Sequence, residues 1–175
     1  MKEVYILLGS NRGEREGMIL RALEMIHAQA GRVVRLSGLY ETAPWGFNDP
    51  VAFLNQVAEI DTDLGPEELL ESLLTIETRL GRIRPPEGCG CGIGGEAAYE
   101  SRTIDLDILF YGNRMVFTDK LMIPHPRLHE RRFTLVPLND LAPDFVHPLL
   151  KASISSLLKR CTDPSAVTVC TGPTG

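Results

Sequence analysis

The sequence predicts an α+β fold in which helices pack on a mixed, mainly antiparallel sheet. Its 175 residues, 43% hydrophobic and 23% charged, have the composition of one ordinary globular domain. Two segments show helical spacing of apolar residues, and four have strand-like composition. Their order is strand, helix, strand, strand, helix, strand, which is a ferredoxin-like arrangement with both helices on one face. The segments are 4–9, 14–30, 32–41, 52–62, 66–80 and 103–111.

The first half of the chain combines apolar strands with one amphipathic helix. Residues 4–9 form a short apolar run that predicts a buried first strand. Apolar residues at helical spacing then predict a helix over 14–30. The segments 32–41 and 52–62 alternate and contain β-branched or aromatic residues, so both are expected to be strands. Prolines and a glycine between them predict a loop, which carries the single tryptophan, Trp45.

The second half begins with a helix whose start is well marked. Gly65, Pro66 and two following glutamates suit a helix N-terminus, and the apolar spacing continues to Leu80. A loop rich in glycine and proline follows over 84–101 and leads into the strand 103–111. Beyond it we expect a short hairpin, short helical pieces that could cover the other sheet face, and a last helix, near 114–124, 127–142 and 153–160.

One domain is expected over residues 1–161, with residues 162–175 as a poorly ordered polar tail. The net charge of −5 lacks the electrostatic signature of a general nucleic-acid binder. No apolar run approaches the ~18 residues of a membrane span, and the N-terminal segment lacks a signal-peptide cleavage site. We therefore expect a cytoplasmic monomer with no nucleic-acid or membrane partner.

Three cysteine or glycine patterns suggest chemistry that their context does not support. Cys89 and Cys91 are the only close cysteine pair, and the other two thiols lack zinc-site spacing, so free thiols are favoured over a metal site. The letters of 90–95 match a dinucleotide-binding motif, but no strand precedes them. Residues 9–13 join a strand to a helix without the Lys-Ser/Thr of a P-loop, so a tight turn with a capping Ser or Asn is expected.

The strand at 103–111 carries two carboxylates at alternate positions. Asp105 and Asp107 therefore share one face, roughly 7 Å apart along the strand. The opposite face is expected to be continuous and apolar, formed by Ile104, Leu106, Ile108 and Phe110. Two adjacent carboxylates favour no packing, so they suggest a site for one or two hard cations. The alternative is the solvated face of an amphipathic strand.

Basic residues around the long loop strengthen the interpretation as a cation site. Arg82 and Arg84 follow the second helix, Arg102 stands three residues before Asp105, and His125 and Arg131 lie further on. Phosphoryl transfer requires carboxylates for magnesium with arginines nearby, because both neutralise phosphate charge. The grouping points to a polyphosphate ligand, although each arginine alone is more often a surface residue.

A third group of residues suits a planar heterocycle. Phe53 and Asn55 fall on one face of their strand, and Phe133 follows Arg131. Aromatic rings can stack on a flat ring, and an amide offers both a donor and an acceptor. The alternative is that both phenylalanines are core residues.

Together these segments resemble the hydroxymethyl-dihydropterin pyrophosphokinase family of folate biosynthesis. The resemblance runs from about Val4 to about Lys159, and the Arg-Thr-Ile-Asp-Leu-Asp-Ile block is its most specific part. The matching segments are 9–11, 40–44, 53–55, 77–84, 102–109, 123–125 and 131–133.

The resemblance implies an αβα sandwich that transfers pyrophosphate from the co-substrate ATP to a pterin hydroxymethyl group, releasing AMP without a covalent intermediate. Asp105 and Asp107 would bind two Mg²⁺ ions, and Arg82 and Arg102 would steady the transferring group. The implied nucleotide contacts are Glu77, Arg84, Tyr99, Ile108, His125 and Arg131. The implied pterin contacts are Thr42, Ala43, Pro44, Trp45, Phe53, Asn55 and Phe133.

The chain departs from the family pattern in the loop before the aspartates. Tyr99-Glu100-Ser101-Arg102 stands where the family has Trp-Gly-Pro-Arg, and a glycine- and cysteine-rich stretch lengthens the loop. Pro126 replaces a tyrosine common after the Pro-His pair. Two alternatives therefore stand beside the pterin enzyme: a kinase or nucleotidyltransferase with another acceptor, and a nucleotide-binding module without catalysis.

Overall fold

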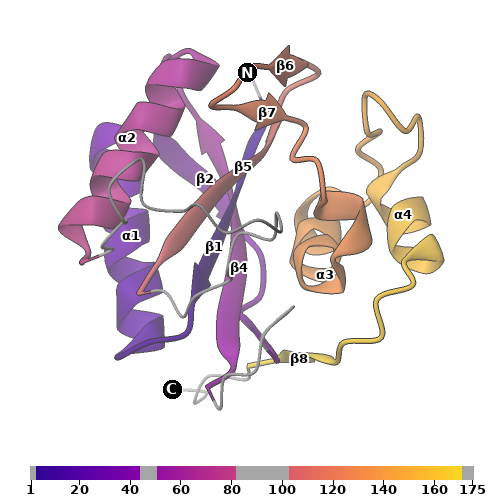
Figure 1. The fold of residues 1–175 in the computed structure, drawn as a ribbon, viewed down its shortest axis with the longest axis horizontal. Coiled ribbons are helices and arrows are strands. Elements are labelled where there is room, and N and C mark those ends of the chain that lie inside the picture. The colour runs from indigo at the N-terminus through magenta and orange to yellow at the C-terminus, as the bar shows by residue number, and fades with distance from the viewer. Residues whose placement is uncertain (1–2, 44–50, 82–102, 171–175) are drawn as a thin grey trace, which may run out of the picture.

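The computed structural model describes residues 3–43, 51–81 and 103–170. A sheet lies between α1 and α2 on one face and α3 and α4 on the other (Figure 1). The elements are β1 Val4–Ser10, α1 Arg15–Gln29, β2 Arg32–Leu36, β3 Tyr40–Thr42, β4 Phe53–Asp61, α2 Pro66–Arg79, β5 Asp105–Tyr111, β6 Val116–Phe117, β7 Met122–Ile123, a 3₁₀ turn Leu128–Glu130, α3 Arg132–Leu141, α4 Ile154–Arg160 and β8 Val167–Val169.

The main sheet has the strand order β5-β1-β4-β3-β8, with β2 pairing with the other half of β4. This order and the two helices on one face confirm the predicted ferredoxin-like fold. We expected a mixed, mainly antiparallel sheet, and every pairing among the described strands is antiparallel. All seven residues of the central strand β1 are buried, because helices or side chains cover both of its faces.

Two hydrophobic cores lie on the two faces of the sheet. Ile6 and Leu8 of β1 face the core under α1 and α2, whereas Tyr5 and Leu7 face the core under α3 and α4. The alternation of side chains along one strand therefore supplies both cores. The C-terminal helices cover the second face, as the sequence predicted.

Strand β5 departs from simple alternation at Leu109. In its pairing with β1, Ile6 lies opposite Ile108 but Tyr5 lies opposite Phe110. Leu109 and Phe110 both pack in the core under α3 and α4, whereas Ile108 packs under α1 and α2. The expectation that Phe110 shares a face with Ile108 is therefore wrong, because a bulge adds one residue and exchanges the faces.

The predicted strand over 32–41 is divided into β2 and β3. At the break, the Ser37 hydroxyl accepts a hydrogen bond from the Val57 N–H at 2.9 Å. The Gly38 N–H donates to the Asp140 carboxylate at 3.1 Å. These side-chain acceptors replace strand partners, so the pairing with β4 is interrupted there.

The segment after Thr162 differs from the poorly ordered tail that the sequence predicted. Residues 162–170 are described, and Val167–Val169 form β8, antiparallel to β3. The pairing satisfies backbone groups that β3 would otherwise expose at the edge of the sheet. The short polar sequence gives little sign of this strand, because its partner supplies the pairing.

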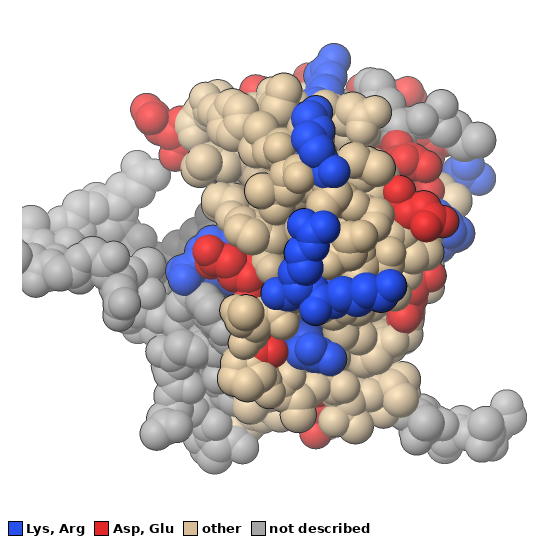
Figure 2. Space-filling model, turned by 90° about the vertical axis from the view of Figure 1, so that its right-hand side faces the viewer, with Lys and Arg blue, Asp and Glu red and all other residues tan. Residues whose placement is uncertain are grey.

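The face of the molecule that carries α4 presents several basic side chains. Figure 2 shows this face, where Lys and Arg side chains form a band across mostly uncharged residues, with Asp and Glu side chains at its flanks. The last turn of α4 contains Lys159 and Arg160.

Among the described helices, none combines the length and the apolar character needed to cross a bilayer.

Candidate active site

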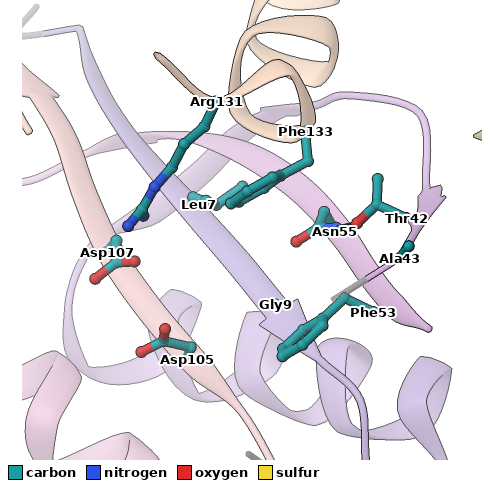
Figure 3. A pocket seen from close by; sticks show the side chains of 10 residues that line it. All are labelled: Leu7, Gly9, Thr42, Ala43, Phe53, Asn55, Asp105, Asp107, Arg131 and Phe133. Atoms are coloured by element: carbon teal, nitrogen blue, oxygen red, sulfur yellow. Dashed lines mark hydrogen bonds between the residues drawn. The ribbon is translucent and has the colours of Figure 1, made fainter. Parts of the chain in front are cut away.

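A pocket opens on the sheet face that α3 and α4 partly cover (Figure 3). About 520 Å³ of space lies between its lining atoms, including the part that is open to solvent. The sheet, the end of β3 and the start of α3 contribute its lining: Leu7, Gly9, Thr42, Ala43, Phe53, Asn55, Asp105, Asp107, Arg131 and Phe133.

The floor of the pocket is a row of three residues on neighbouring strands. Gly9 on β1 pairs with Asn55 on β4 and with Asp105 on β5. Two interstrand spacings place Asn55 and Asp105 about 10 Å apart, with the glycine between them. A Cβ atom at Gly9 would lie 3.3 Å from Asn55 Oδ1 and 3.9 Å from Phe53 Cδ1. Glycine therefore keeps the floor open between an amide and a carboxylate.

The Asn55 amide is held in place by β3. Its Nδ2 donates to Thr42 Oγ1 at 2.8 Å, and both side chains are buried. This bond orients the amide with Oδ1 near Gly9. A buried, oriented amide can read the hydrogen-bonding edge of a heterocycle.

Two aromatic rings stand above this floor. Figure 3 shows Phe133 and Phe53 on either side of the Asn55 side chain, with the two aspartates at the other end of the pocket. The Arg131 guanidinium lies 5.7 Å from the Phe133 ring centre. A planar ligand stacked on these rings would have one edge at the amide and the other toward the carboxylates.

The carboxylates of Asp105 and Asp107 lie on the pocket side of β5, as predicted. Both are half-buried. The described residues contain no group of three or more His, Cys, Asp or Glu side chains that could hold a metal. A pair of carboxylates suits Mg²⁺, because this cation keeps water and substrate phosphate oxygens as its other ligands.

Two contacts fix β5 behind these carboxylates. Glu77 on α2 is 1% exposed, and its Oε1 accepts a hydrogen bond from the Leu106 N–H at 2.8 Å. The Ser10 hydroxyl donates to the Thr103 carbonyl at 2.6 Å. The expected capping of α1 by Ser10 or Asn11 is wrong, because the N-cap residue is Glu14, without a side-chain cap bond.

Two of the three basic residues predicted for the nucleotide site, Arg131 and His125, lie beside the carboxylates. Burial lowers the pKa of Arg131 to about 10, so it stays a cation at neutral pH, and Figure 3 shows it pointing toward Asp107. Burial also lowers the pKa of His125, against the opposing effect of the Asp105 charge. His125 Nδ1 accepts a hydrogen bond from the Arg127 N–H at 3.2 Å, which leaves Nε2 to carry the proton.

Not every predicted site residue lines the pocket. The Ile108 side chain is buried in the core under α1 and α2, so it does not face the pocket. Six predicted site residues lie outside the described residues: Pro44, Trp45, Arg82, Arg84, Tyr99 and Arg102. The motif at 90–95, with Cys89 and Cys91, also lies outside them.

Two lining residues, Leu7 and Gly9, were not predicted as site residues from the sequence. Leu7 has the pattern of an ordinary core residue in an apolar strand. Gly9 was assigned to a turn and to the first segment of the family resemblance, although a glycine that ends an apolar strand can mark the close approach of a ligand.

The fold and the pocket define a ferredoxin-like enzyme whose pocket places two aromatic rings and an oriented amide beside a pair of carboxylates. The sequence model of the family described as 7,8-dihydro-6-hydroxymethylpterin-pyrophosphokinase (HPPK) matches residues 5–143. The chain belongs to this family and is an ATP-dependent pyrophosphokinase of folate biosynthesis. This match confirms the family resemblance that the sequence motifs indicated.

Relatives are found in bacteria and in a fungus. The 2-amino-4-hydroxy-6-hydroxymethyldihydropteridine pyrophosphokinase of Porphyromonas gingivalis is 40% identical over 85% of this chain and 95% of its own length. The Bacillus subtilis protein of the same name is 42% identical over 78% of this chain and 76% of its own length. The Pneumocystis carinii "Folic acid synthesis protein fol1" is 42% identical over 91% of this chain, which spans only 20% of that relative.

A solved structure shows the same fold. A crystal structure of Plasmodium falciparum HPPK-DHPS matches 91% of this chain and 44% of its own with a TM-score of 0.72 at 18% identity. The chain described here therefore spans less than half of that longer protein.

Proposed function

We propose that this chain transfers the pyrophosphoryl group of ATP to the hydroxymethyl oxygen of 6-hydroxymethyl-7,8-dihydropterin and releases AMP. The observation that carries the proposal is the row Asn55–Gly9–Asp105, which spans the distance from an oriented amide to a carboxylate. The names of the bacterial relatives support the same substrate.

The pterin would lie between the pocket rings with its amide edge at Asn55. Phe53 and Phe133 would stack on the ring system, and the end of β3 at Thr42 and Ala43 would close one side. Pro44 and Trp45 continue this segment and complete the proposed pterin contacts. In this orientation the hydroxymethyl group would point toward the aspartates, where phosphate chemistry is expected.

Asp105 and Asp107 would hold Mg²⁺, and two ions are expected. When bound, the metal would neutralise phosphate charge and favour deprotonation of the hydroxyl. The buried cation of Arg131 lies on the same side of the pocket and would contact phosphate oxygens.

The transfer would need no nucleophilic side chain. The hydroxymethyl oxygen would attack the β-phosphorus of ATP and lose its proton. The bond between the β-phosphorus and the oxygen that bridges it to the α-phosphorus would break, and AMP would leave with that oxygen. The chain's contribution would be positioning and charge stabilisation, without a covalent protein intermediate. Arg82 and Arg102 would steady the transferring group. The remaining nucleotide contacts would be Arg84, Tyr99 and His125. The resemblance also implied Glu77 and Ile108, but the Glu77 carboxylate is bound to the Leu106 N–H and the Ile108 side chain lies in the opposite core.

We further propose a cytoplasmic monomer. The ten described lining residues of this chain already include the rings, the amide and the carboxylates that the proposed reaction uses. Because the reaction consumes ATP, it would take place where ATP is supplied.

A product assay tests the proposal. The chain is incubated with ATP, Mg²⁺ and the dihydropterin, and AMP is resolved from ADP. AMP that forms only with the pterin supports pyrophosphoryl transfer, whereas ADP would indicate single phosphoryl transfer to another acceptor. ATP binding without turnover would favour the module without catalysis. Intact-mass spectrometry of the quenched reaction should show no added phosphate on the protein.

A further inference from the structure

The C-terminal segment, residues 162–170, lies outside the family match, which ends at residue 143. It contacts both walls of the pocket, the start of α3 and the strand β3. We propose that this segment positions the pterin pocket and that Asp163 is its main positioning residue. The proposal rests on the proposed function, because the pocket's ligand is taken to be a pterin.

The first contact is made at the start of α3. The Asp163 Oδ2 atom accepts a hydrogen bond from the Arg132 N–H at 2.9 Å. Arg132 lies between Arg131 and Phe133, both of which line the pocket. The N-cap residue of α3, Arg131, makes no side-chain cap bond. Asp163 therefore caps α3 from a distant part of the chain, with a negative charge at the end of the helix that favours it.

The Asp163 carboxylate is itself fixed in place. Its Oδ1 atom accepts hydrogen bonds from the Ser165 N–H at 3.0 Å and from the Ser165 hydroxyl at 2.6 Å. Burial alone would raise the pKa of Asp163, but the bonds from Ser165 and Arg132 outweigh it and lower the pKa. The group is thus an oriented anion, and only 9% of it is exposed.

The second contact is made along β3. In the antiparallel pairing with β8, Thr42 lies opposite Val167 and Tyr40 lies opposite Val169. The Cys170 N–H continues this pairing by donating to the Leu39 carbonyl at 2.8 Å. Thr42 is the residue whose hydroxyl holds the Asn55 amide. The strand β8 therefore supports the wall that orients the amide.

The two contacts are close together along the chain. Asp163 contacts the pocket wall that carries Phe133, and β8 contacts the wall that carries Thr42. Only residues 164–166 separate Asp163 from the start of β8. A short segment fastened at both ends limits how far the two walls can separate. We therefore expect it to set the spacing between the Phe133 ring and the Asn55 amide.

A double-mutant cycle tests the role of Asp163. Calorimetry measures the affinity for 6-hydroxymethylpterin, with Mg²⁺ and a non-hydrolysable ATP analogue present, for the unaltered chain, Asp163→Ala, Phe133→Leu and the double variant. We expect Asp163→Ala to weaken binding by up to about fivefold, because the pterin would then have to order the helix start that the lost cap leaves loose. In the Phe133→Leu background the same change should have almost no effect, because Asp163 acts through that wall.

Two outcomes overturn the proposal: unchanged affinity in Asp163→Ala, or an equal loss in both backgrounds, which a purely structural role would give. Asp163→Asn keeps one carbonyl acceptor and should restore part of the affinity. If the unaltered chain binds the nucleotide analogue but no pterin, the proposed function itself fails, and the inference fails with it. Thermal melts check that each variant is folded at the assay temperature.

A matched pair of substitutions tests β8. The pairing register and the Cys170 bond place the Thr168 N–H toward β3, while its side chain is exposed. Thr168→Pro removes that donor and should weaken pterin binding severalfold. Thr168→Ala keeps the donor and should bind like the unaltered chain. Equal affinities of the two variants would overturn the role of β8.

Discussion

The Glu77 carboxylate accepts a hydrogen bond from the backbone N–H of Leu106, the residue between the two pocket aspartates. Strand β5 is the last of the described strands on this side of the sheet, so this N–H faces no further described strand. A buried acid on α2 thus replaces a strand partner. It fixes the backbone from which both carboxylates project.

Glu77→Ala should therefore destabilise the protein and impair Mg²⁺ binding together. The buried Leu106 N–H would lose this acceptor, which costs about 1–3 kcal/mol of unfolding free energy. Urea denaturation and the Mg²⁺ dependence of AMP formation measure the two effects. Glu77→Gln keeps an acceptor oxygen and should be affected less. Glu71→Ala, at an exposed position of the same helix, is the control. Equal stability of the alanine variants would contradict this role for Glu77.

Replacing either pocket aspartate by asparagine should abolish most of the turnover while leaving the fold intact. We expect kcat to fall by about a hundredfold or more, because charge stabilisation at the transferring group is lost. Steady-state AMP formation over a range of Mg²⁺ concentrations measures this loss. Asp119→Asn, at an exposed position after β6, should behave like the unaltered chain. An Asp105→Asn or Asp107→Asn enzyme with unaltered kcat would show that the carboxylates are only a solvated face.

Gly9→Ala should impair pterin binding with little effect on ATP. The added methyl group would lie 3.3 Å from Asn55 Oδ1 and would narrow the floor of the pocket. We expect the KM for the pterin to rise about tenfold, as expected when a tight contact costs about 1.4 kcal/mol. Gly17→Ala, on α1, meets only the Glu14 Cβ atom at 3.5 Å and is the matched control. A KM for ATP that rises in parallel would argue against a specific effect on the pterin.

The stability of the fold should decline as the pH falls below about 6.5. Burial, followed by the charge of His129, lowers the pKa of His147 from its ordinary 6.5 to about 4. Between these values the unfolded chain binds a proton that the folded chain does not. The free energy of unfolding should therefore fall with a slope of up to about 1.4 kcal/mol per pH unit.

Urea denaturation at pH 7, 6 and 5 measures this slope. His147 Nδ1 accepts hydrogen bonds from the N–H groups of Leu149 and Leu150, each at 3.2 Å. His147→Asn places a non-titrating acceptor near the same position and should flatten the slope. Burial also lowers the pKa of His125, so the contribution of His125 to the slope would remain in this variant. The same slope in both proteins would exclude His147 as its source.

Much of the fold could be predicted because local patterns and tertiary structure agree. The helix α2 begins at Pro66 as expected, and the Gly65 N–H donates to Glu68 Oε2 at 2.7 Å. Phe110 could not be placed, because the bulge at Leu109 is visible only in the pairing with β1. The strand β8 was missed for a similar reason, since its pairing with β3 joins residues far apart in the chain.

The candidate site was predictable where chemistry restricts the choice of residue. Asp105 and Asp107 have few structural uses on a strand, and they line the pocket. The family resemblance placed Glu77 at the nucleotide. Sequence motifs do not show that the hydrogen-bond partner of its carboxylate is the Leu106 backbone N–H. Gly9 escaped notice because its contribution is the side chain it lacks, which only the neighbouring Asn55 and Phe53 reveal.

The separation of the two cores bears on how such a protein can change over generations. The pocket lies on the side of the sheet opposite α1 and α2, whose core is closed and apolar. Apart from Glu77, which links α2 to the strand of the two aspartates, residues of that closed layer can change thermal tolerance without altering the pocket. Changes in α3 or the C-terminal segment can alter substrate choice while the closed layer maintains the fold. Outside that one link, durability and specificity can therefore be inherited separately in this architecture.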